Sequence, residues 1–226
     1  MPTIAIVGAG PGMGLAIAKL FGSKGFQVAL LARTPDNLDK LVGELATAGV
    51  SAAAFPADVM ERDGLTAALR DAAAHFGGID VLEYSPAVHT PAAGFNPVSP
   101  SASTVADLQT QIQYNLYGAV TAARAVLPAM RDAGAGTLLF TTGGGSINPV
   151  PMFGNINPAQ AALRNWAINL HNELAGTGVY VGHVAIGAWI GDGAPEGFPS
   201  ATADQIAPVY WDLHSSRDAA EHLFTA

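Results

Sequence analysis

The chain has 226 residues, of which 50% are hydrophobic, and a formal net charge of −8 at neutral pH. This length and composition predict one α/β domain with a sizeable core. The acidic balance argues against a nucleic-acid partner, because such partners need a basic face. The absence of cysteine excludes a disulfide, a thiolate nucleophile and a thiolate metal site, and we expect no metal.

The sequence shows no feature of a membrane or secreted protein and no boundary between domains. No apolar run approaches the ~20 residues that a membrane span needs, and the start Met1-Pro2-Thr3 lacks the basic region of a signal peptide. We therefore expect a cytoplasmic protein with no membrane partner. No repeat, low-complexity tract or linker divides residues 1–226, which predicts a single domain.

Short apolar runs alternate with helical stretches along the chain. The predicted strands cover residues 4–7, 27–31, 51–55, 81–84, 136–141 and 179–185, with 221–226 as a further edge strand. The predicted helices cover residues 12–23, 35–48, 61–75, 103–132, 158–175 and 202–214. This order predicts a doubly wound parallel sheet whose ligand site lies beyond the carboxyl ends of the strands. The Pro- and Gly-rich segments 86–100 and 187–200 follow such ends and are candidate substrate loops.

The first predicted strand runs into the glycine-rich turn V7-G-A-G-P-G-M-G14. Gly8, Gly12 and Gly14 let the backbone approach a pyrophosphate and let the helix pack on the strand, with Pro11 and Met13 between them. The helix that follows offers free N–H groups and a positive dipole end to phosphates. A tight turn without a ligand is the alternative, but the strand–turn–helix context favours a nucleotide.

The residue after the second strand indicates which nucleotide. An acid there would bind a ribose 2′-hydroxyl and repel a 2′-phosphate, yet the sequence has Arg33-Thr34, and the guanidinium suits a phosphate. This favours NADP(H) over NAD(H), with an ordinary surface arginine as the alternative. Asp58, at the end of the third strand, is placed to accept from an adenine amino group, or is a helix cap.

Taken together, the motifs resemble the short-chain dehydrogenase/reductase family. They are G8-x-x-x-G12-x-G14, Arg33, D58-V59, I79-D-V-L82, Y114-N-L-Y-G118, L127-P-A-M130 and the V184-A-I-G187 turn. They cover essentially the whole chain in the family's order and spacing. The resemblance implies a single Rossmann-type dinucleotide-binding domain with a mostly parallel seven-stranded sheet and helices on both faces.

The resemblance also implies partners and chemistry. It implies a nicotinamide cofactor, reversible carbonyl/alcohol chemistry on a small-molecule ligand, and a homo-oligomer, either a dimer or a tetramer. It extends the cofactor site to Thr34, Val59, Ser85 and Ile190. Helices 103–132 and 158–175 are the expected interface, because both carry apolar residues on more than one face and Trp166 and Leu170 are large for exposed positions.

The family's reaction uses a Tyr as proton donor, a Lys four residues later, a Ser about thirteen residues before the Tyr, and an Asn in the preceding long helix. Asn115 matches the Asn and lies on the apolar stripe of its helix. It is either the remnant of the proton relay or a structural amide that bonds neighbouring backbone. The resemblance places Gly143 at the Ser position, Ile156 at the Tyr position and Gln160 at the Lys position.

No shifted alignment restores the missing pair. All lysines precede residue 41 (Lys19, Lys24 and Lys40), and no tyrosine lies between Tyr117 and Tyr180. Neither Ile nor Gln can serve as a general acid. Asn157-Pro158 with Gln160 reads instead as a helix start, with Asn157 as the cap and Gln160 reaching back to its N–H. We therefore expect no catalytic residue in the family's positions.

Other side chains are candidates for a substitute proton donor or hydrogen-bond donor. They are His89, His183, Tyr84, Tyr117, Thr141, Thr142 and Ser146. His183 reads better as a packed core histidine, and the hydroxyls in the glycine loop read as supports of the turn. Arg164 is a candidate for a phosphate or ribose contact, or a solvated residue.

Three functions remain open at this point. The first is an NADP(H)-binding protein without the usual chemistry, acting as a sensor, scaffold or inactive subunit. The second is an active NADP-dependent oxidoreductase with a non-standard or water-supplied proton. The third, a descendant that no longer binds nucleotide, is disfavoured by the glycine turn, Arg33 and Asp58.

Overall fold

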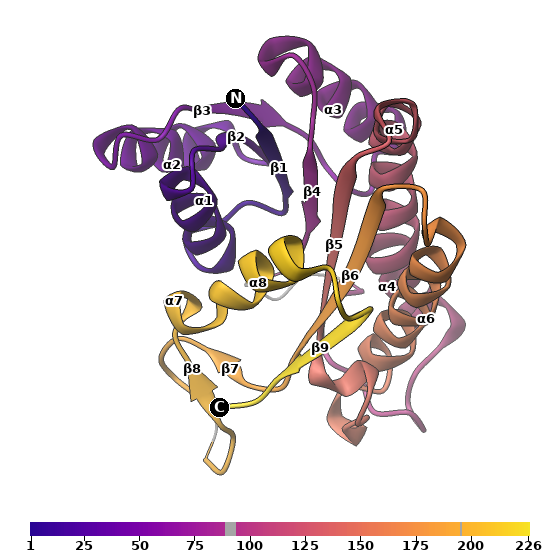
Figure 1. The fold of residues 1–226 in the computed structure, drawn as a ribbon. Helices are drawn as coiled ribbons and strands as arrows, with labels where there is room; N and C mark the ends of the chain where they lie inside the picture. Colours follow the sequence, from indigo (N-terminus) through magenta and orange to yellow (C-terminus); the bar gives the residue numbers. More distant parts are fainter. Residues whose placement is uncertain (89–93, 195) are drawn as a thin grey trace.

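A seven-stranded sheet forms the centre of the computed structural model, which describes residues 1–88, 94–194 and 196–226 (Figure 1). The strands lie in the order β3-β2-β1-β4-β5-β6-β9. Every pairing in this sheet is parallel, so the expected doubly wound Rossmann-type fold is confirmed and the sheet is wholly parallel. The predicted edge strand is present as β9, beside β6.

The strands of this sheet are β1 (Thr3–Val7), β2 (Gln27–Ala32), β3 (Ala52–Pro56), β4 (Val81–Tyr84), β5 (Gly136–Gly143), β6 (Val179–Ile186) and β9 (Glu221–Phe224). The α-helices are α1 (Met13–Ser23), α2 (Pro35–Thr47), α3 (Arg62–Phe76), α4 (Val105–Ile112), α5 (Gly118–Ala133), α6 (Ile156–Leu174), α7 (Ala203–Ile206) and α8 (Pro208–Ser216). A π-helical turn η1 (Gln113–Tyr117) joins α4 to α5, and two 3-10 turns, η2 (Gly144–Ser146) and η3 (Pro151–Phe153), follow β5. Strands β7 (Trp189–Ile190) and β8 (Ser200–Ala201) form a separate pair.

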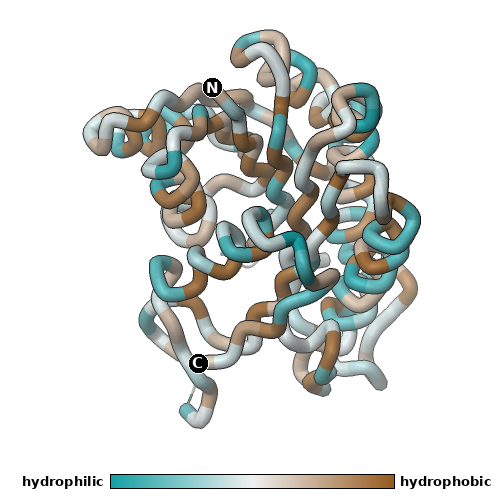
Figure 2. Tube along the Cα trace, viewed as in Figure 1, coloured by the Kyte–Doolittle hydropathy of each residue, from teal (hydrophilic) through white to brown (hydrophobic). Residues whose placement is uncertain are grey.

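Helices cover both faces of the sheet, which explains the near-continuous apolar runs of its strands. Along β1, Ile4 and Ile6 pack with α1, α2 and α8 on one face. Ala5 and Val7 pack with α3, α5 and α6 on the other face. Hydrophobic residues accordingly follow the strands through the interior (Figure 2). None of the helices in the described part of the chain is long and apolar enough to cross a membrane.

The turn after β1 lies directly against the segment that follows β4. Gly8 has φ of +96°, and a Cβ added there would overlap the backbone of Pro86. The N–H of Ser85 donates to the carbonyl oxygen of Val7 at 2.9 Å. The strands that follow β1 in the chain lie first on one side of it (β2 and β3) and then on the other side (β4 onward). The carboxyl ends of β1 and β4 therefore form the topological switch point, where α/β folds bind ligands.

Two predicted helices differ in the structure. The stretch predicted as one helix over 103–132 begins at Val105, after a capping box between Thr104 and Asp107, and contains the π turn η1. The stretch predicted over 202–214 divides into α7 and α8, with Pro208 at the start of α8. The helix predicted over 158–175 is confirmed and begins at Ile156, two residues before the predicted start, which is within the usual uncertainty of helix boundaries.

The expectation that Trp166 and Leu170 are exposed is wrong. Leu170 is buried, and the ring of the half-buried Trp166 packs edge-on against Phe140 at a centroid distance of 5.3 Å. Both side chains belong to the core beneath α6, where Leu163 and Leu174 are also buried. Their size therefore gives no argument for a subunit interface.

Candidate cofactor site and ligand pocket

The glycine-rich turn leaves room for a ligand at the start of α1. Gly12 precedes the helix without any side-chain cap, and the first turn has no acidic residue. A Cβ added at Gly10 or Gly12 would meet no atom within 4 Å. Within the described residues, the N–H groups of Gly12, Met13 and Gly14 have no backbone acceptor. Free N–H groups at the positive end of a helix fit a pyrophosphate.

The residues expected to bind the adenosine half lie near one another. Arg33 and Thr34 are exposed after β2, and Asp58 is half-buried after β3. Asp58 accepts the N–H of Met60 at 2.9 Å, so it supports the turn before α3. Burial raises the pKa of the Tyr114 phenol to about 12. The positive charge of Arg33 acts against this rise, and the negative charge of Asp58 adds to it. Both charges therefore lie close enough to Tyr114 to affect its ionisation.

The other three expected cofactor residues occupy different environments. Val59 is 7% exposed and lies beneath α5, where a Cβ added at Gly118 would come within 3.3 Å of its carbonyl oxygen. The Ser85 hydroxyl donates to Glu83 Oε2 at 2.8 Å, at the end of β4. Ile190 is 40% exposed in β7 and does not line the pocket described below.

Asn115 is buried in the π turn η1, the kind of helix defect that frequently occurs at functional sites. Its Nδ2 donates to the carbonyl oxygen of Gln111 at 3.0 Å and lies 3.2 Å from Gln111 Oε1. These contacts match the structural alternative, an amide satisfied by its own helix.

A pocket of about 440 Å³ opens beyond the carboxyl ends of β5 and β6, where the fold is expected to bind its ligand. Its lining residues come mainly from the loops after these two strands and from the start of α6. They are Gly143, Gly144, Gly145, Asn148, Val150, Met152, Phe153, Ile156, Asn157, Gln160, Ile186, Gly187, Ala188, Trp189, Phe198, Leu223 and Thr225. None of these described lining residues is titratable near neutral pH.

The three positions assigned to the family's Ser, Tyr and Lys meet in this pocket. Gly143, Ile156 and Gln160 all line it. Gln160 Oε1 accepts the backbone N–H of Gly143 at 3.2 Å, across the loop that joins β5 to α6. An apolar side chain and a neutral amide thus lie at two of the three positions assigned from the sequence.

The predicted capping role of Asn157 and Gln160 is wrong. Helix α6 starts one residue before Asn157, and no side chain caps it. Asn157 Nδ2 donates to the carbonyl oxygen of Val150 at 3.0 Å, while Gln160 turns to Gly143. Both side chains therefore hold the pocket loop instead of closing the helix end.

Two of the candidate substitute donors are engaged away from the pocket. Tyr84 is 1% exposed, and its hydroxyl donates to the carbonyl oxygen of Tyr114 at 2.5 Å. Tyr117 is 45% exposed, and its ring lies 5.3 Å from the Arg62 guanidinium. Neither lines the pocket. His89 lies outside the described residues.

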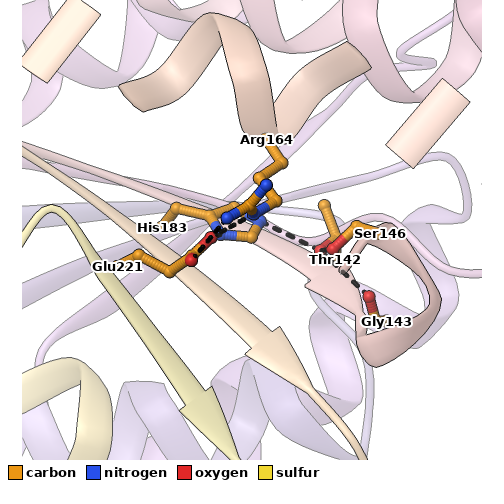
Figure 3. Close-up of polar contacts among 6 residues, drawn as sticks. All are labelled: Thr142, Gly143, Ser146, Arg164, His183 and Glu221. Carbon is orange, nitrogen blue, oxygen red and sulfur yellow. Dashed lines mark hydrogen bonds and ion pairs between the residues drawn. The ribbon is translucent and has the colours of Figure 1, made fainter. Parts of the chain in front are cut away.

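A partly buried chain of hydrogen bonds contains most of the other candidates (Figure 3). Thr142 Oγ1 lies 2.8 Å from Ser146 Oγ and 2.9 Å from His183 Nε2. His183 Nδ1 lies 3.0 Å from Glu221 Oε2. Arg164 holds the Glu221 carboxylate with two nitrogens, Nη2 at 2.8 Å from Oε1. The chain connects the loop after β5 to the edge strand β9.

The charges in this chain follow from burial and pairing. Burial lowers the pKa of His183 to about 4, so its imidazole is neutral at physiological pH. The hydrogen bonds from Arg164 hold the pKa of Glu221 below its ordinary value. His183 Nδ1–H therefore donates to Glu221, and Nε2 accepts from Thr142. His183 is a core residue, as expected. Arg164 forms its ion pair with Glu221 and is not placed as a phosphate ligand.

Glu83 is a buried acid that the sequence reading missed. It lies in β4 with 0% exposure, where Ser85 and Thr141 donate to its two oxygens at 2.8 and 2.9 Å. Tyr210 adds its hydroxyl, 2.8 Å from Thr141 Oγ1. Burial raises the pKa of Glu83 to about 8, against the lowering effect of the two hydrogen bonds. The signal was an acid inside the apolar run V81-L-E-Y84.

Comparison with known proteins shows the family of the chain. Residues 2–192 match the model of the family described as short chain dehydrogenase, so the chain belongs to the short-chain dehydrogenase family. An uncharacterised oxidoreductase of Mycobacterium bovis is 26% identical over 96% of this chain. The chain spans 65% of that relative's length.

Solved structures share the fold over nearly the whole chain. L-Sorbose reductase from Gluconobacter frateurii, complexed with NADPH and L-sorbose, has a TM-score of 0.84 at 21% identity, with 99% of this chain and 95% of that chain covered. A metagenomic short-chain oxidoreductase in complex with NADP has a TM-score of 0.82 at 26% identity, covering 99% and 96%. A Brucella melitensis 3-oxoacyl-[acyl-carrier protein] reductase with bound NAD has a TM-score of 0.84 at 20% identity, covering 98% and 89%.

Proposed function

We propose that this chain is an NADP(H)-binding member of the short-chain dehydrogenase family without the family's usual carbonyl/alcohol chemistry, serving as a sensor, scaffold or inactive subunit. The observation that carries the proposal is the pocket, which brings Gly143, Ile156 and Gln160 together and has no titratable residue among the described residues that line it. General acid–base catalysis typically contributes ~10²–10⁴-fold to a rate. A pocket without such a group holds a ligand but gives its carbonyl oxygen no proton.

The nucleotide half of the proposal rests on the turn after β1. Its free N–H groups would hold the pyrophosphate, Arg33 the 2′-phosphate and Asp58 the adenine amino group. The related structures include complexes with NADPH, NADP and NAD, so the preference for NADP(H) rests on Arg33 in this chain. When bound, the nicotinamide would supply or accept a hydride.

The alternative is an active NADP-dependent oxidoreductase with a non-standard proton donor. Among the described residues, Tyr84, Tyr117 and His183 are turned to other partners and do not line the pocket. A donor would then have to be a water molecule or His89. This alternative differs from the proposal in one measurable property, turnover.

We further propose that residues 1–226 act as one dinucleotide-binding domain in a cytoplasmic homo-oligomer, a dimer or tetramer. In the stretch expected to form part of the interface, Val105 is 79% exposed and Tyr117 is 45% exposed, which supports a contact surface on helices α4 and α5.

Purification with its cofactor content measured tests the first half of the proposal. Mass spectrometry of the freshly purified protein, denatured to release small molecules, should detect NADP⁺ or NADPH. Titration of nucleotide-free protein should give saturable binding of both. Absence of bound nucleotide together with no saturable binding would contradict the proposal and favour a purely structural descendant of the family.

A further inference from the structure

A chain of three hydroxyl groups and one carboxyl group joins the end of β4 to helix α8. Ser85 Oγ lies 2.8 Å from Glu83 Oε2, and Thr141 Oγ1 lies 2.9 Å from Glu83 Oε1. The hydroxyl of Tyr210 in α8 lies 2.8 Å from Thr141 Oγ1. Glu83 and Tyr210 are fully buried, whereas Ser85 is half-buried. The chain therefore leads from the interior to a partly accessible hydroxyl, that of Ser85.

Ser85 lies at the turn where the nucleotide phosphates are expected. Its N–H donates to the carbonyl oxygen of Val7 at 2.9 Å, at the end of β1. The next residue, Pro86, occupies the space that a Cβ at Gly8 would need. Ser85 and the glycine-rich turn are thus packed together at the topological switch point. A change in the hydrogen bond of the Ser85 hydroxyl therefore takes place at the proposed cofactor site.

Glu83 is a neutral acid at physiological pH. Burial raises its pKa to about 8, although the hydrogen bonds of Ser85 and Thr141 lower it, and no charged group of the described residues contributes. The titratable side chain that faces Glu83 is Tyr210. Burial holds the pKa of this phenol well above its usual range, and the Glu83 charge adds to the rise. Glu83 is therefore the member of this chain that ionises at mildly alkaline pH.

The elements around Glu83 bring no counter-ion to it. On the flanking strands, Ile6 of β1 and Leu139 of β5 are its partners in register. Lys19 of α1 pairs at the surface with Glu44, with 3.7 Å between their charged atoms. On α8, Asp212 is exposed, and the His214 ring lies 3.0 Å from the hydroxyl of Thr137.

A protonated Glu83 must donate one hydrogen bond, whereas the ionised form accepts from both neighbouring hydroxyls. The distances between heavy atoms allow the hydrogen on either oxygen of each pair. In one arrangement, Glu83 Oε2–H donates to Ser85 Oγ. Thr141 then donates to Glu83 Oε1, and Tyr210 donates to Thr141. Every fully buried hydrogen of the chain has an acceptor, and the Ser85 hydrogen is left free for a ligand.

The other arrangement leaves a buried hydrogen without an acceptor. If Glu83 Oε1–H donates to Thr141, then Thr141 donates to Tyr210, and the Tyr210 hydrogen has no acceptor among the described residues. A buried donor without a partner is costly, so the arrangement that frees the Ser85 hydrogen is favoured.

Ionisation of Glu83 reverses the bond to Ser85. A carboxylate has no hydrogen to donate, so the Ser85 O–H turns to Glu83 Oε2 and is lost to a ligand. The same step creates a buried negative charge close to the turn, where salt screens it less than at the surface. Both effects disfavour the binding of an anionic nucleotide.

We propose that Glu83 is a pH-sensitive switch for nucleotide binding. While its carboxyl is protonated, the Ser85 hydroxyl donates to an oxygen of the bound dinucleotide. When the carboxyl ionises, Glu83 takes this hydrogen bond back and repels the phosphates. The inference rests on the proposed function, because it requires NADP(H) to bind at the turn. Glu83 is a positioning residue that acts through Ser85.

Binding and protonation must then be linked. A nucleotide that prefers the protonated form of Glu83 raises the pKa of this carboxyl, so binding at alkaline pH takes up a proton. Isothermal titration calorimetry in two buffers of different ionisation enthalpy measures both the dissociation constant and the proton uptake. NADPH is the probe, because its nicotinamide carries no positive charge that would favour the carboxylate.

Three variants isolate the switch. Glu83→Gln keeps the protonated arrangement at every pH, because its Nε2 donates to Ser85 and its Oε1 accepts from Thr141. Ser85→Ala removes the hydroxyl and leaves the carboxyl. Glu173→Gln, whose side chain is 65% exposed on α6, is the control for loss of an acid.

Wild type should bind NADPH about three- to tenfold more weakly at about pH 9 than at about pH 7, one unit either side of the Glu83 pKa. Proton uptake should approach about one per NADPH at the higher pH. Glu83→Gln should bind at both pH values as wild type does at the lower one, without proton uptake. Ser85→Ala should bind more weakly at the lower pH and change less with pH. Glu173→Gln should follow wild type.

The outcomes separate this inference from the proposed function. NADPH binding with the same pH dependence in wild type and Glu83→Gln overturns the inference and leaves the proposed function standing. No binding of NADPH to wild type at either pH overturns both. Should Glu83→Gln fail to fold, Ser85→Ala decides, because a pH dependence equal to that of wild type in this variant also overturns the switch.

Discussion

The side-chain oxygen of Gln160 accepts the backbone N–H of Gly143 at 3.2 Å. These are the two positions at which we expect the family's Lys and Ser from the sequence, and a hydrogen bond from backbone to a neutral side-chain amide joins them here. The hydrogen bond holds Gln160 of α6 against the end of β5, and Ile156 lines the same pocket. This contact is the structural basis of our proposal that the chain binds a ligand here without transferring a proton.

Arg33→Ala should weaken NADP(H) binding about 10- to 100-fold, because a charge-assisted hydrogen bond to the 2′-phosphate is lost. NAD(H), which lacks that phosphate, should bind the variant and wild type equally. Fluorescence titration with both nucleotides measures the effect, and Arg70→Ala, at an exposed position of α3, is the control. An unchanged NADP(H) affinity in Arg33→Ala would refute the assignment.

Glu83 should make the protein less stable as the pH rises. Its pKa is about 8 in the folded chain against 4.5 ordinarily, so between these values the folded state holds a proton that the unfolded state has released. The free energy of unfolding then falls with pH, at most by about 1.4 kcal/mol per pH unit for one proton. The stability that this proton contributes is fully present below pH 4.5 and is lost as the pH rises through about 8.

Glu83→Gln removes this titration and keeps one acceptor and one donor for Ser85 and Thr141. Urea unfolding across this pH range should show a flatter profile for the variant and a gain over wild type at alkaline pH. Glu173→Gln, whose side chain is 65% exposed, should change the profile little. Parallel profiles for Glu83→Gln and wild type would contradict the buried protonated state.

The sheet could be predicted from sequence because both of its faces are covered. Strands such as β1 and β6 are apolar at nearly every position, and turn residues separate them from the helices. The edge strand β9 was predictable at its correct position. The glycine turn was predictable for a similar reason, since strand, turn and helix are adjacent in the chain.

The contacts that shape the pocket depend on residues far apart in sequence, and local patterns do not reveal them. The cap predicted for Asn157 and Gln160 fails because Val150 and Gly143 offer these amides better-placed partners. In the π turn η1, the backbone carbonyl oxygen of Tyr114 accepts a hydrogen bond from the hydroxyl of Tyr84, a residue thirty positions earlier in the chain. Four exposed apolar side chains that line the pocket come from four segments, which only the folded chain brings together. They are Met152, Trp189, Phe198 and Leu223.

Gly118→Ala should destabilise the protein by about 1–3 kcal/mol, the usual effect of overpacking a core. A Cβ added at Gly118 would overlap the hydroxyl of the buried Tyr84. The matched control is Gly43→Ala in α2, where an added Cβ meets nothing within 4 Å and the change should stabilise the helix by ~0.5–1 kcal/mol. Denaturant unfolding compares the two, and equal stabilities would contradict the packing.

The cost of Gly118→Ala should be smaller in a Tyr84→Phe background, because the overlapping oxygen is absent. Contacting residues are expected to couple in this way. Strict additivity of the two substitutions in unfolding free energy would show that the overlap does not decide the effect.

The protein should be a dimer or tetramer in solution at micromolar concentration. Val105 in α4 and Tyr117 in η1 are exposed and supply apolar contact surface. Multi-angle light scattering of purified wild type gives the mass directly. A mass equal to that of one 23.0 kDa chain would contradict this prediction.

The most direct test of the account is the rate of NADPH oxidation by the wild type, with NADP(H) binding verified on the same preparation. Neutral ketones and aldehydes are offered as substrates, and absorbance follows the consumption of NADPH. We expect a rate indistinguishable from that of NADPH and carbonyl compound without protein, because Ile156 and Gln160 supply no proton. Robust turnover that His89→Ala or Tyr84→Phe abolishes would contradict it, since the chemistry would then have moved to another residue.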